Sequence, residues 1–206
     1  MSAEITAKLI VMDTGPLITL AAADSLDYLI YPALPVYVPD AVFYEATRDA
    51  DMLGAQQVMD WAQKHAGEVH IVPTQAFANF LQDSAATPGR YREKDLGERA
   101  ALEAIHDAVQ LGPDERAILM TEDDRVLRQV LVTESELTKK MIPITTRDFL
   151  EGLEQAQRIQ SVEAVYQRAE DAGRHATQRS VLVQQHDKAI EAVRSIMQSK
   201  DHGFER

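Results

Sequence analysis

Acidic residues follow two apolar segments of this 206-residue chain, at positions where enzymes often place reactive groups. Asp13 comes directly after the apolar residues 9–12. Asp123 and Asp124 come shortly after a second apolar segment, residues 117–120. Short continuous apolar runs are typical of strands that are buried on both faces of a parallel sheet. Because ligands bind beyond the carboxyl ends of such strands, these acids are candidates for chemistry.

Two further acids lie on predicted helices, on the face that also carries apolar residues. Glu98 shares its face with Ala101, Leu102, Ile105 and Val109, and Glu45 shares its face with Ala41 and Val42. A carboxylate on an apolar face costs free energy unless it is paired or binds a metal. Several converging carboxylates also repel one another. A divalent cation removes that repulsion, and ligands that are all oxygen favour Mg²⁺ or Mn²⁺.

Each of these acids also has a purely structural interpretation. Asp13 could cap the helix that follows the first strand, and Glu45 could be a solvated helix residue. Asp95 and Glu98 have the spacing of a capping box, as do Thr121 and Asp124, which leaves Asp123 without that explanation. The prediction of a metal site therefore rests on the joint pattern of the acids.

Strands and helices alternate along residues 1–157. The predicted strands cover residues 9–12, 36–38, 69–72, 117–120 and 142–145, and the predicted helices cover 16–24, 26–31, 40–47, 53–65, 75–82, 95–111, 125–132 and 149–157. Residues 83–94 are expected to form a loop. This alternation predicts an α/β fold with three layers, α/β/α, around a small parallel sheet.

The chain changes character after about residue 158, where no strand pattern is found. Apolar residues then recur at helical spacing, at Ile159, Val162, Tyr166 and Ala169 and again at Ala189, Val193 and Met197. Gly173 is expected to interrupt the helix. We predict a domain at 1–157 and a helical C-terminal extension at 158–206, whose apolar face either packs on that domain or binds a partner.

Composition excludes several classes of protein. The formal net charge of −12 argues against binding nucleic acid through bulk charge, and residues 1–150 hold 24 of the 33 acids. With no cysteine, a disulfide scaffold and thiolate metal sites are excluded. No apolar run reaches the roughly 18 residues of a membrane span, and residues 1–8 do not resemble a signal peptide. We expect a cytoplasmic protein.

Four segments carry a resemblance to a known family. They are LIVMDTGPLITLA at 9–21, VPDAVFYE at 38–45, DLGERAAL at 95–102 and ILMTEDDR at 118–125. In order and spacing they resemble the PIN-domain nucleases, and among these the VapC-type toxin ribonucleases, over about residues 8 to 150. The resemblance implies metal-dependent hydrolysis of RNA phosphodiester bonds, with Mg²⁺ or Mn²⁺ as cofactor. It also implies an RNA substrate and, as further candidate partners, an antitoxin protein and a second copy of the chain.

The family's functional residues can be placed on this sequence by position. The resemblance implies catalytic and metal-binding roles for Asp13, Glu98 and Asp123, and Asp124 is the competing assignment for Asp123. Glu45 matches an acid that is frequent but less essential in the family, and Thr14 matches a hydroxyl residue that supports the site. The extension after residue 158 departs from the usual toxins.

Basic residues near these acids are candidate substrate contacts. Arg92 lies in the predicted loop before Glu98, where Arg90, Tyr91 and Lys94 also occur, and Arg99 and Arg125 closely follow candidate ligands. Such residues could bind RNA phosphates. A mixed-charge surface loop is the alternative interpretation.

Other functions fit the sequence less well. A haloacid-dehalogenase-type phosphatase would need an acid where Gly15 stands, and the acidic pair and late lysine of a response-regulator receiver are not evident. Neither a Walker-type phosphate loop nor a dinucleotide-binding glycine motif occurs. The remaining alternative is a non-catalytic module that binds a protein partner through its helical extension.

Overall fold

A single parallel sheet organises the chain. The structure is a computed structural model that describes residues 7–86, 96–108, 111–112, 115–123, 138–176 and 183–201. Its five strands are β1 (Ala7–Val11), β2 (Val36–Pro39), β3 (Val69–Val72), β4 (Arg116–Met120) and β5 (Met141–Ile144). They lie in the order β3-β2-β1-β4-β5, and every neighbouring pair is parallel. The predicted small parallel sheet is confirmed.

The central strand β1 is buried on both faces. Leu9 and Val11 pack into one apolar cluster, whereas Ile10 belongs with Met12 to a second cluster. All four side chains have no exposed surface. This two-sided burial explains why the segment is apolar throughout and does not alternate with polar residues.

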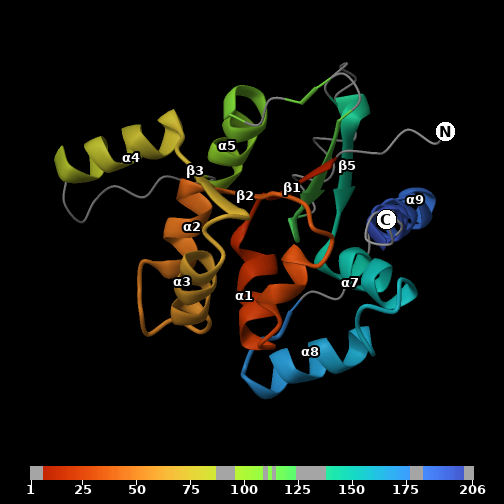
Figure 1. Ribbon diagram of the computed structural model, residues 1–206. Coiled ribbons are helices and arrows are strands. Elements are labelled where there is room, and N and C mark those ends of the chain that lie inside the picture. Colours follow the sequence, from red (N-terminus) through yellow and green to blue (C-terminus); the bar gives the residue numbers. More distant parts are fainter. Residues whose placement is uncertain are drawn as a thin grey trace.

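Helices cover both faces of the sheet (Figure 1). The larger cluster includes residues of α1 (Thr14–Ala22), α3 (Ala55–Lys64), α7 (Thr146–Gln155), α8 (Val162–Asp171) and α9 (Val183–Asp201). On the other face, α5 (Leu96–Glu103) contributes to the second cluster, and it also packs with α2 (Asp40–Thr47) and α4 (Gln75–Ala86). The predicted three-layer α/β/α architecture is therefore confirmed.

Some element boundaries differ from the sequence prediction. Helix α4 continues to Ala86, so the first part of the expected loop 83–94 is helical; the rest lies outside the described residues. The helix expected at 95–111 changes to a π-helical turn at Ala104–Ala108. The helix expected at 125–132 also lies outside the described residues. As predicted, α8 ends just before Gly173, which has a left-handed φ of +92°.

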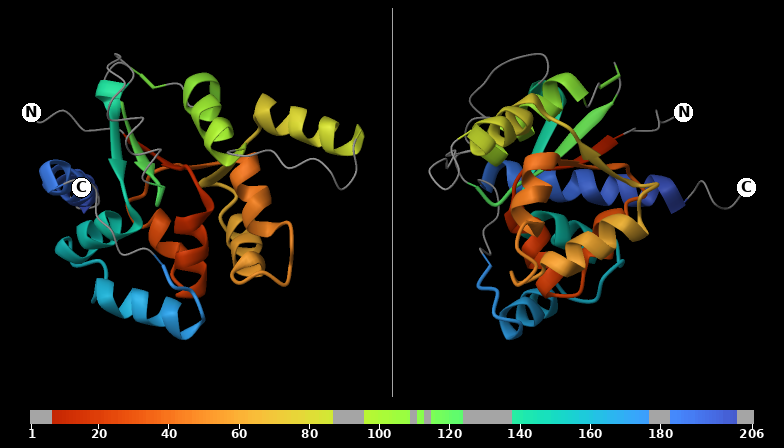
Figure 2. Two further views of the ribbon diagram at one scale, coloured as in Figure 1. Left: turned by 180° about the vertical axis from the view of Figure 1, so that it is seen from behind. Right: turned by 90° about the vertical axis from the view of Figure 1, so that its left-hand side faces the viewer.

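The C-terminal helices pack on the rest of the molecule. Val162, Val165 and Tyr166 of α8 belong to the same buried cluster as Leu9 of β1. Helix α9 lies beside α7 in the views of Figures 1 and 2, where a Cβ added to Gly152 would be 2.6 Å from Cβ of Val193. Such a distance means that the two helices approach each other almost at backbone contact. The apolar face of the extension is therefore used within the chain.

Candidate active site

The carboxyl ends of β1 and β4 lie side by side. The two strands are paired in parallel up to Val11 and Met120, and the amide of Met12 donates to the carbonyl of Met120 at 2.9 Å. Asp13 and Asp123, which follow these strands, are therefore brought to the same edge of the sheet. The sequence predicted that these two strand ends could be neighbours, and the pairing places them so.

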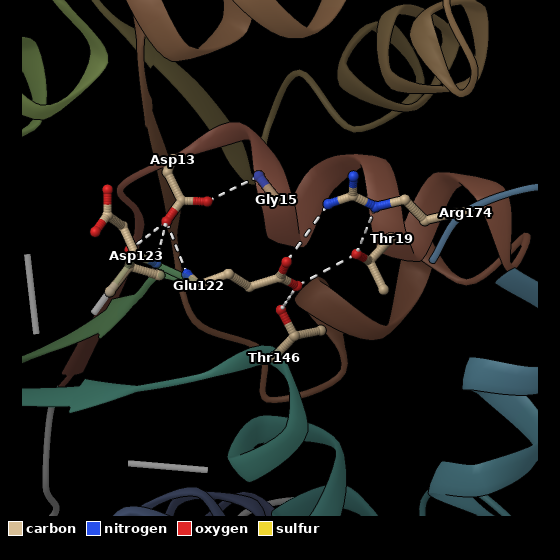
Figure 3. Close-up of polar contacts among 8 residues, drawn as sticks. Asp13, Gly15, Thr19, Glu122, Asp123, Thr146 and Arg174 are labelled. Carbon is tan, nitrogen blue, oxygen red and sulfur yellow. Dashed lines mark hydrogen bonds and ion pairs between the residues drawn. The ribbon is translucent and has the colours of Figure 1, made fainter. Parts of the chain in front are cut away.

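Asp13 accepts hydrogen bonds with both carboxylate oxygens (Figure 3). Its Oδ1 accepts from the amide of Gly15 at 2.7 Å, so Asp13 is the N-cap of α1. Its Oδ2 accepts from the amides of Glu122 at 2.8 Å and Asp123 at 3.3 Å, and from the hydroxyl of Thr121. The capping interpretation is therefore correct, and it coexists with a position at the strand ends.

Burial shapes the electrostatics of this carboxylate. Removal from water raises the pKa of Asp13 above its usual value, although the donors from Thr121, Glu122 and Gly15 act in the opposite direction. Burial also raises the pKa of Glu45; Arg48 opposes this shift and the charge of Asp13 adds to it. Glu45 thus lies within electrostatic range of Asp13. Two acids whose ionised forms are disfavoured mark a candidate functional site.

Glu45 lies against the start of α5. Its Oε2 is 3.3 Å from the position that a Cβ on Gly97 would occupy. The glycine in the segment DLGERAAL therefore leaves space for this carboxylate beside α5. Glu98, the next residue, lies in the same helix, and only its backbone is described.

The other predicted site residues are distributed as follows. Asp123 is half-buried, and in Figure 3 its carboxylate lies on the side of Asp13 away from Glu122. Thr14 is half-buried in the first turn of α1, and Arg99 is exposed on α5. Asp124, Arg92 and Arg125 lie outside the described residues.

Glu122 is an acid of this edge that sequence reasoning missed. Its side chain is only 9% exposed, and its Oε1 accepts from the hydroxyls of Thr146 at 2.7 Å and Thr19 at 3.2 Å. Its Oε2 is 3.5 Å from Nη2 of Arg174. Burial raises its pKa; the bond from Thr146 opposes this shift, and the charge of Asp13 adds to it.

Gly15 carries the sequence signal that could have revealed Glu122. A Cβ at this position would be 2.6 Å from Oε2 of Glu122 and 2.9 Å from Oδ1 of Asp13. Real Cβ atoms essentially never approach other atoms so closely. The two carboxylates therefore meet over a residue without a side chain, which is why glycine follows Asp13-Thr14.

Comparison with known protein families identifies the family to which this chain belongs. The PIN-domain family matches residues 9–135, which is more than half of the chain and includes Asp13, Glu45, Glu98 and the Glu122 region. The chain belongs to the PIN-domain nuclease family. No match was found among curated proteins or among solved structures. The matched part of this PIN-domain protein ends before α7, α8 and α9.

PIN domains are generally metal-dependent nucleases, and the residues of this PIN domain are suited to a hard cation. The acids at the strand ends offer only oxygen ligands, the type that Mg²⁺ and Mn²⁺ prefer. Among the described residues, Oδ1 of Asp13 accepts from the amide of Gly15 alone, which leaves a second lone pair for a cation. In the described part of the chain, no three His, Asp or Glu side chains form a ready coordination sphere.

Proposed function

We propose that this PIN-domain protein is an endoribonuclease that uses Mg²⁺ or Mn²⁺ to hydrolyse phosphodiester bonds of RNA. The observation that carries the proposal is the half-buried Asp13 carboxylate at the joined ends of β1 and β4, whose pKa is raised because it is partly removed from water. Ordinary helix capping needs no second acid nearby, yet Glu45 and Glu122 both lie within electrostatic range of Asp13. Converging carboxylates of this kind favour a bound cation.

In this proposal, Asp13, Glu98 and Asp123 bind the cation and form the catalytic set. Glu45 and Asp124 supply further carboxylates at the same edge. A divalent cation, when bound, polarises the phosphate and makes a nearby water molecule more acidic. Asp13 is fixed by donors from both strand ends, and Glu98 is the candidate for orienting the attacking water.

RNA binding is proposed to be local. Thr14, Arg92, Arg99 and Arg125 are the candidate substrate contacts, and Arg99 is exposed on α5, the helix that also carries Glu98. The net charge of −12 opposes attraction of RNA by the whole surface. A few arginines close to the cation are therefore expected to supply the phosphate contacts.

The resemblance to VapC-type toxins supports a finer proposal. The chain would be the toxin of a toxin–antitoxin pair in the cytoplasm, with an antitoxin protein and a second copy of itself as partners. A basic antitoxin segment would complement the acidic face. In the described part of the chain we found no helix with the length and apolar character needed to cross a membrane.

A cleavage assay tests the enzyme. The purified chain should cleave single-stranded RNA with Mg²⁺ or Mn²⁺ and lose this activity in chelator. Asp13→Asn and Glu98→Gln should each lower the rate by at least about a hundredfold, because each removes a proposed cation ligand. Asp60→Asn is the matched control, since Asp60 lies on α3 and contacts Gln56. Equal cleavage by the Asp13 and Glu98 variants and the wild type would reveal a contaminating nuclease and refute the proposal.

A further inference from the structure

One residue of the C-terminal segment contacts the acidic edge of the sheet. Arg174 follows α8, outside the part of the chain that matches the PIN-domain family. Its Nε donates to the hydroxyl of Thr19 at 3.3 Å, and its Nη2 pairs with Oε2 of Glu122 at 3.5 Å. Figure 3 shows the guanidinium on the side of Glu122 that faces away from Asp123.

Glu122 is close enough to Asp13 to compete for the same cation. Its Oε2 and Oδ1 of Asp13 both lie less than 3 Å from one point, the position of a Cβ on Gly15. Glu122 is also almost fully buried, at 9% exposure. A buried carboxylate without partners would be costly, so either a cation or protein donors must satisfy it.

The structure supplies protein donors. The hydroxyls of Thr19 and Thr146 bind Oε1 of Glu122, and Arg174 is the cation that pairs with Oε2. The Arg174 side chain is 30% exposed and that of Glu122 is 9% exposed, so the arginine lies on the more solvent-accessible side of this pair. Within the described residues, Arg174 is the basic side chain that contacts this acid.

We propose that Arg174 is a positioning residue that pairs with Glu122 and keeps this carboxylate from binding the catalytic cation. This inference rests on the proposed function, because it assumes that a cation binds at Asp13. It assigns the C-terminal extension a part in the active site. Removal of Arg174 would release Oε2 of Glu122 for the cation, while Oε1 would still accept from Thr19 and Thr146.

Arg168 provides a matched control in the same segment. Arg168 also connects the extension to α1. It donates to the carbonyl of Ala23 and to the hydroxyl of Ser25, which follow the C-terminal end of that helix, whereas Asp13 lies at its N-terminal end. It shares with Arg174 the role of anchoring the extension, and it makes no contact with Glu122 in the described structure. If only the anchoring of the extension matters, substitution of Arg168 and substitution of Arg174 should therefore change Mn²⁺ binding alike.

The proposal is tested by measuring the affinity of the full-length chain for Mn²⁺, by calorimetry and by electron paramagnetic resonance of the free ion. The variants are Arg174→Gln, Glu122→Gln, the double variant and Arg168→Gln. Arg174→Gln should tighten Mn²⁺ binding, and this effect should be at least about threefold larger in the wild-type background than in the Glu122→Gln background, as expected for coupled neighbours. Arg168→Gln should leave Mn²⁺ affinity unchanged.

Several outcomes would overturn the role of Arg174. If Arg174→Gln changes the Mn²⁺ affinity equally in the wild-type and Glu122→Gln chains, the arginine acts on the cation only through its charge. If Arg174→Gln leaves the Mn²⁺ affinity unchanged, Arg174 does not restrain Glu122. The same shift in Arg168→Gln would indicate general loosening of the extension. If Arg174→Gln does not fold, Arg174→Met in the same two backgrounds takes its place, because methionine keeps an unbranched apolar side chain and removes the charge that pairs with Glu122. A wild-type chain that binds no Mn²⁺ would instead refute the proposed function.

Discussion

At the scale of single residues, Asp13 combines a structural and a chemical position. As N-cap it binds the amide of Gly15, and through Oδ2 it joins the start of α1 to the end of β4. Burial makes its ionised form unfavourable, whereas its hydrogen-bond donors favour that form. The carboxylate is thereby fixed in place, but its ionised form is incompletely stabilised, and a bound cation would supply the missing stabilisation.

Gly15→Ala should damage the site through one methyl group. The new Cβ would overlap the carboxylates of Glu122 and Asp13, at 2.6 and 2.9 Å. We expect RNA cleavage to fall at least about tenfold, with a loss of about 1–3 kcal/mol in the free energy of unfolding, as for overpacked sites. Gly67→Ala is the control, because a Cβ there would have no atom within 4 Å. Full activity in Gly15→Ala would show that the two carboxylates need not occupy these positions.

The ion pair between Asp27 and Lys64 should give a small, pH-dependent stabilisation. The 2.7 Å hydrogen bond from Lys64 lowers the pKa of Asp27 below its usual 3.8. The stabilisation is therefore complete above that usual value and is lost as the pH falls through the lower, folded-state value. Since both side chains are largely exposed, Lys64→Gln should cost less than about 1 kcal/mol at neutral pH.

Urea unfolding of wild type and Lys64→Gln at several pH values checks this prediction. The difference between the two unfolding free energies should shrink as the pH falls below 3.8. A difference that grows in acid would contradict the sign argued from the lowered pKa.

The sequence reveals some site residues and hides others for physical reasons. Asp13 and Asp123 follow buried strands, and a parallel sheet brings such strand ends together, so their meeting could be predicted. For Glu122, Gly15 indicates only that a side chain is excluded beside Asp13; it does not identify the group there, because the partners of Glu122, which are Thr19, Thr146 and Arg174, are distant along the chain. Contacts of that kind depend on tertiary packing, which no local pattern encodes.

At the scale of elements, two-sided burial made the strands predictable and left the helix ends uncertain. The central strands β1 and β4 were located because their apolar runs reflect burial on both faces, whereas the edge strand β3 has the short apolar pattern of a strand but exposes His70 and Ile71. Helix α4 extends to Ala86 through residues that were expected to form a loop. Residues 82–86 are mostly exposed, so this last part of the helix has no buried apolar face that a sequence pattern could reveal.

The contact between α7 and α9 depends on one glycine. A Cβ on Gly152 would lie 2.6 Å from Cβ and 2.7 Å from Cγ1 of Val193, so Gly152→Ala must separate the helices. We expect thermal unfolding to show a loss of at least about 2 kcal/mol, in the upper part of the range for overpacked cores. Gly112→Ala is the control, since its Cβ would meet Glu115 at an ordinary 3.5 Å. A stability equal to wild type would mean that α9 does not pack so closely on α7.

At the scale of the whole molecule, the extension belongs to the core of the PIN-domain protein. Buried residues of α8 and α9 lie in the same apolar cluster as residues of β1 and α1; they are Val162, Val165, Tyr166, Ala169, Ala189, Val193, Ile196 and Met197. The predicted boundary at residue 157 followed a change in sequence pattern. A change of pattern marks where strands stop, whereas an independent domain also needs a complete core of its own.

Truncation after residue 157 should therefore prevent stable folding of residues 1–157. It would expose the apolar faces of α1 and α7 that α8 and α9 cover. Each large buried side chain contributes about 1.5–3 kcal/mol, so the sum over these helices rivals the roughly 5–15 kcal/mol by which whole domains are stable. Circular dichroism during heating should show no cooperative transition for residues 1–157, and one for the full chain. A cooperative transition in the truncated chain would establish 1–157 as an independent domain and the extension as an addition to it.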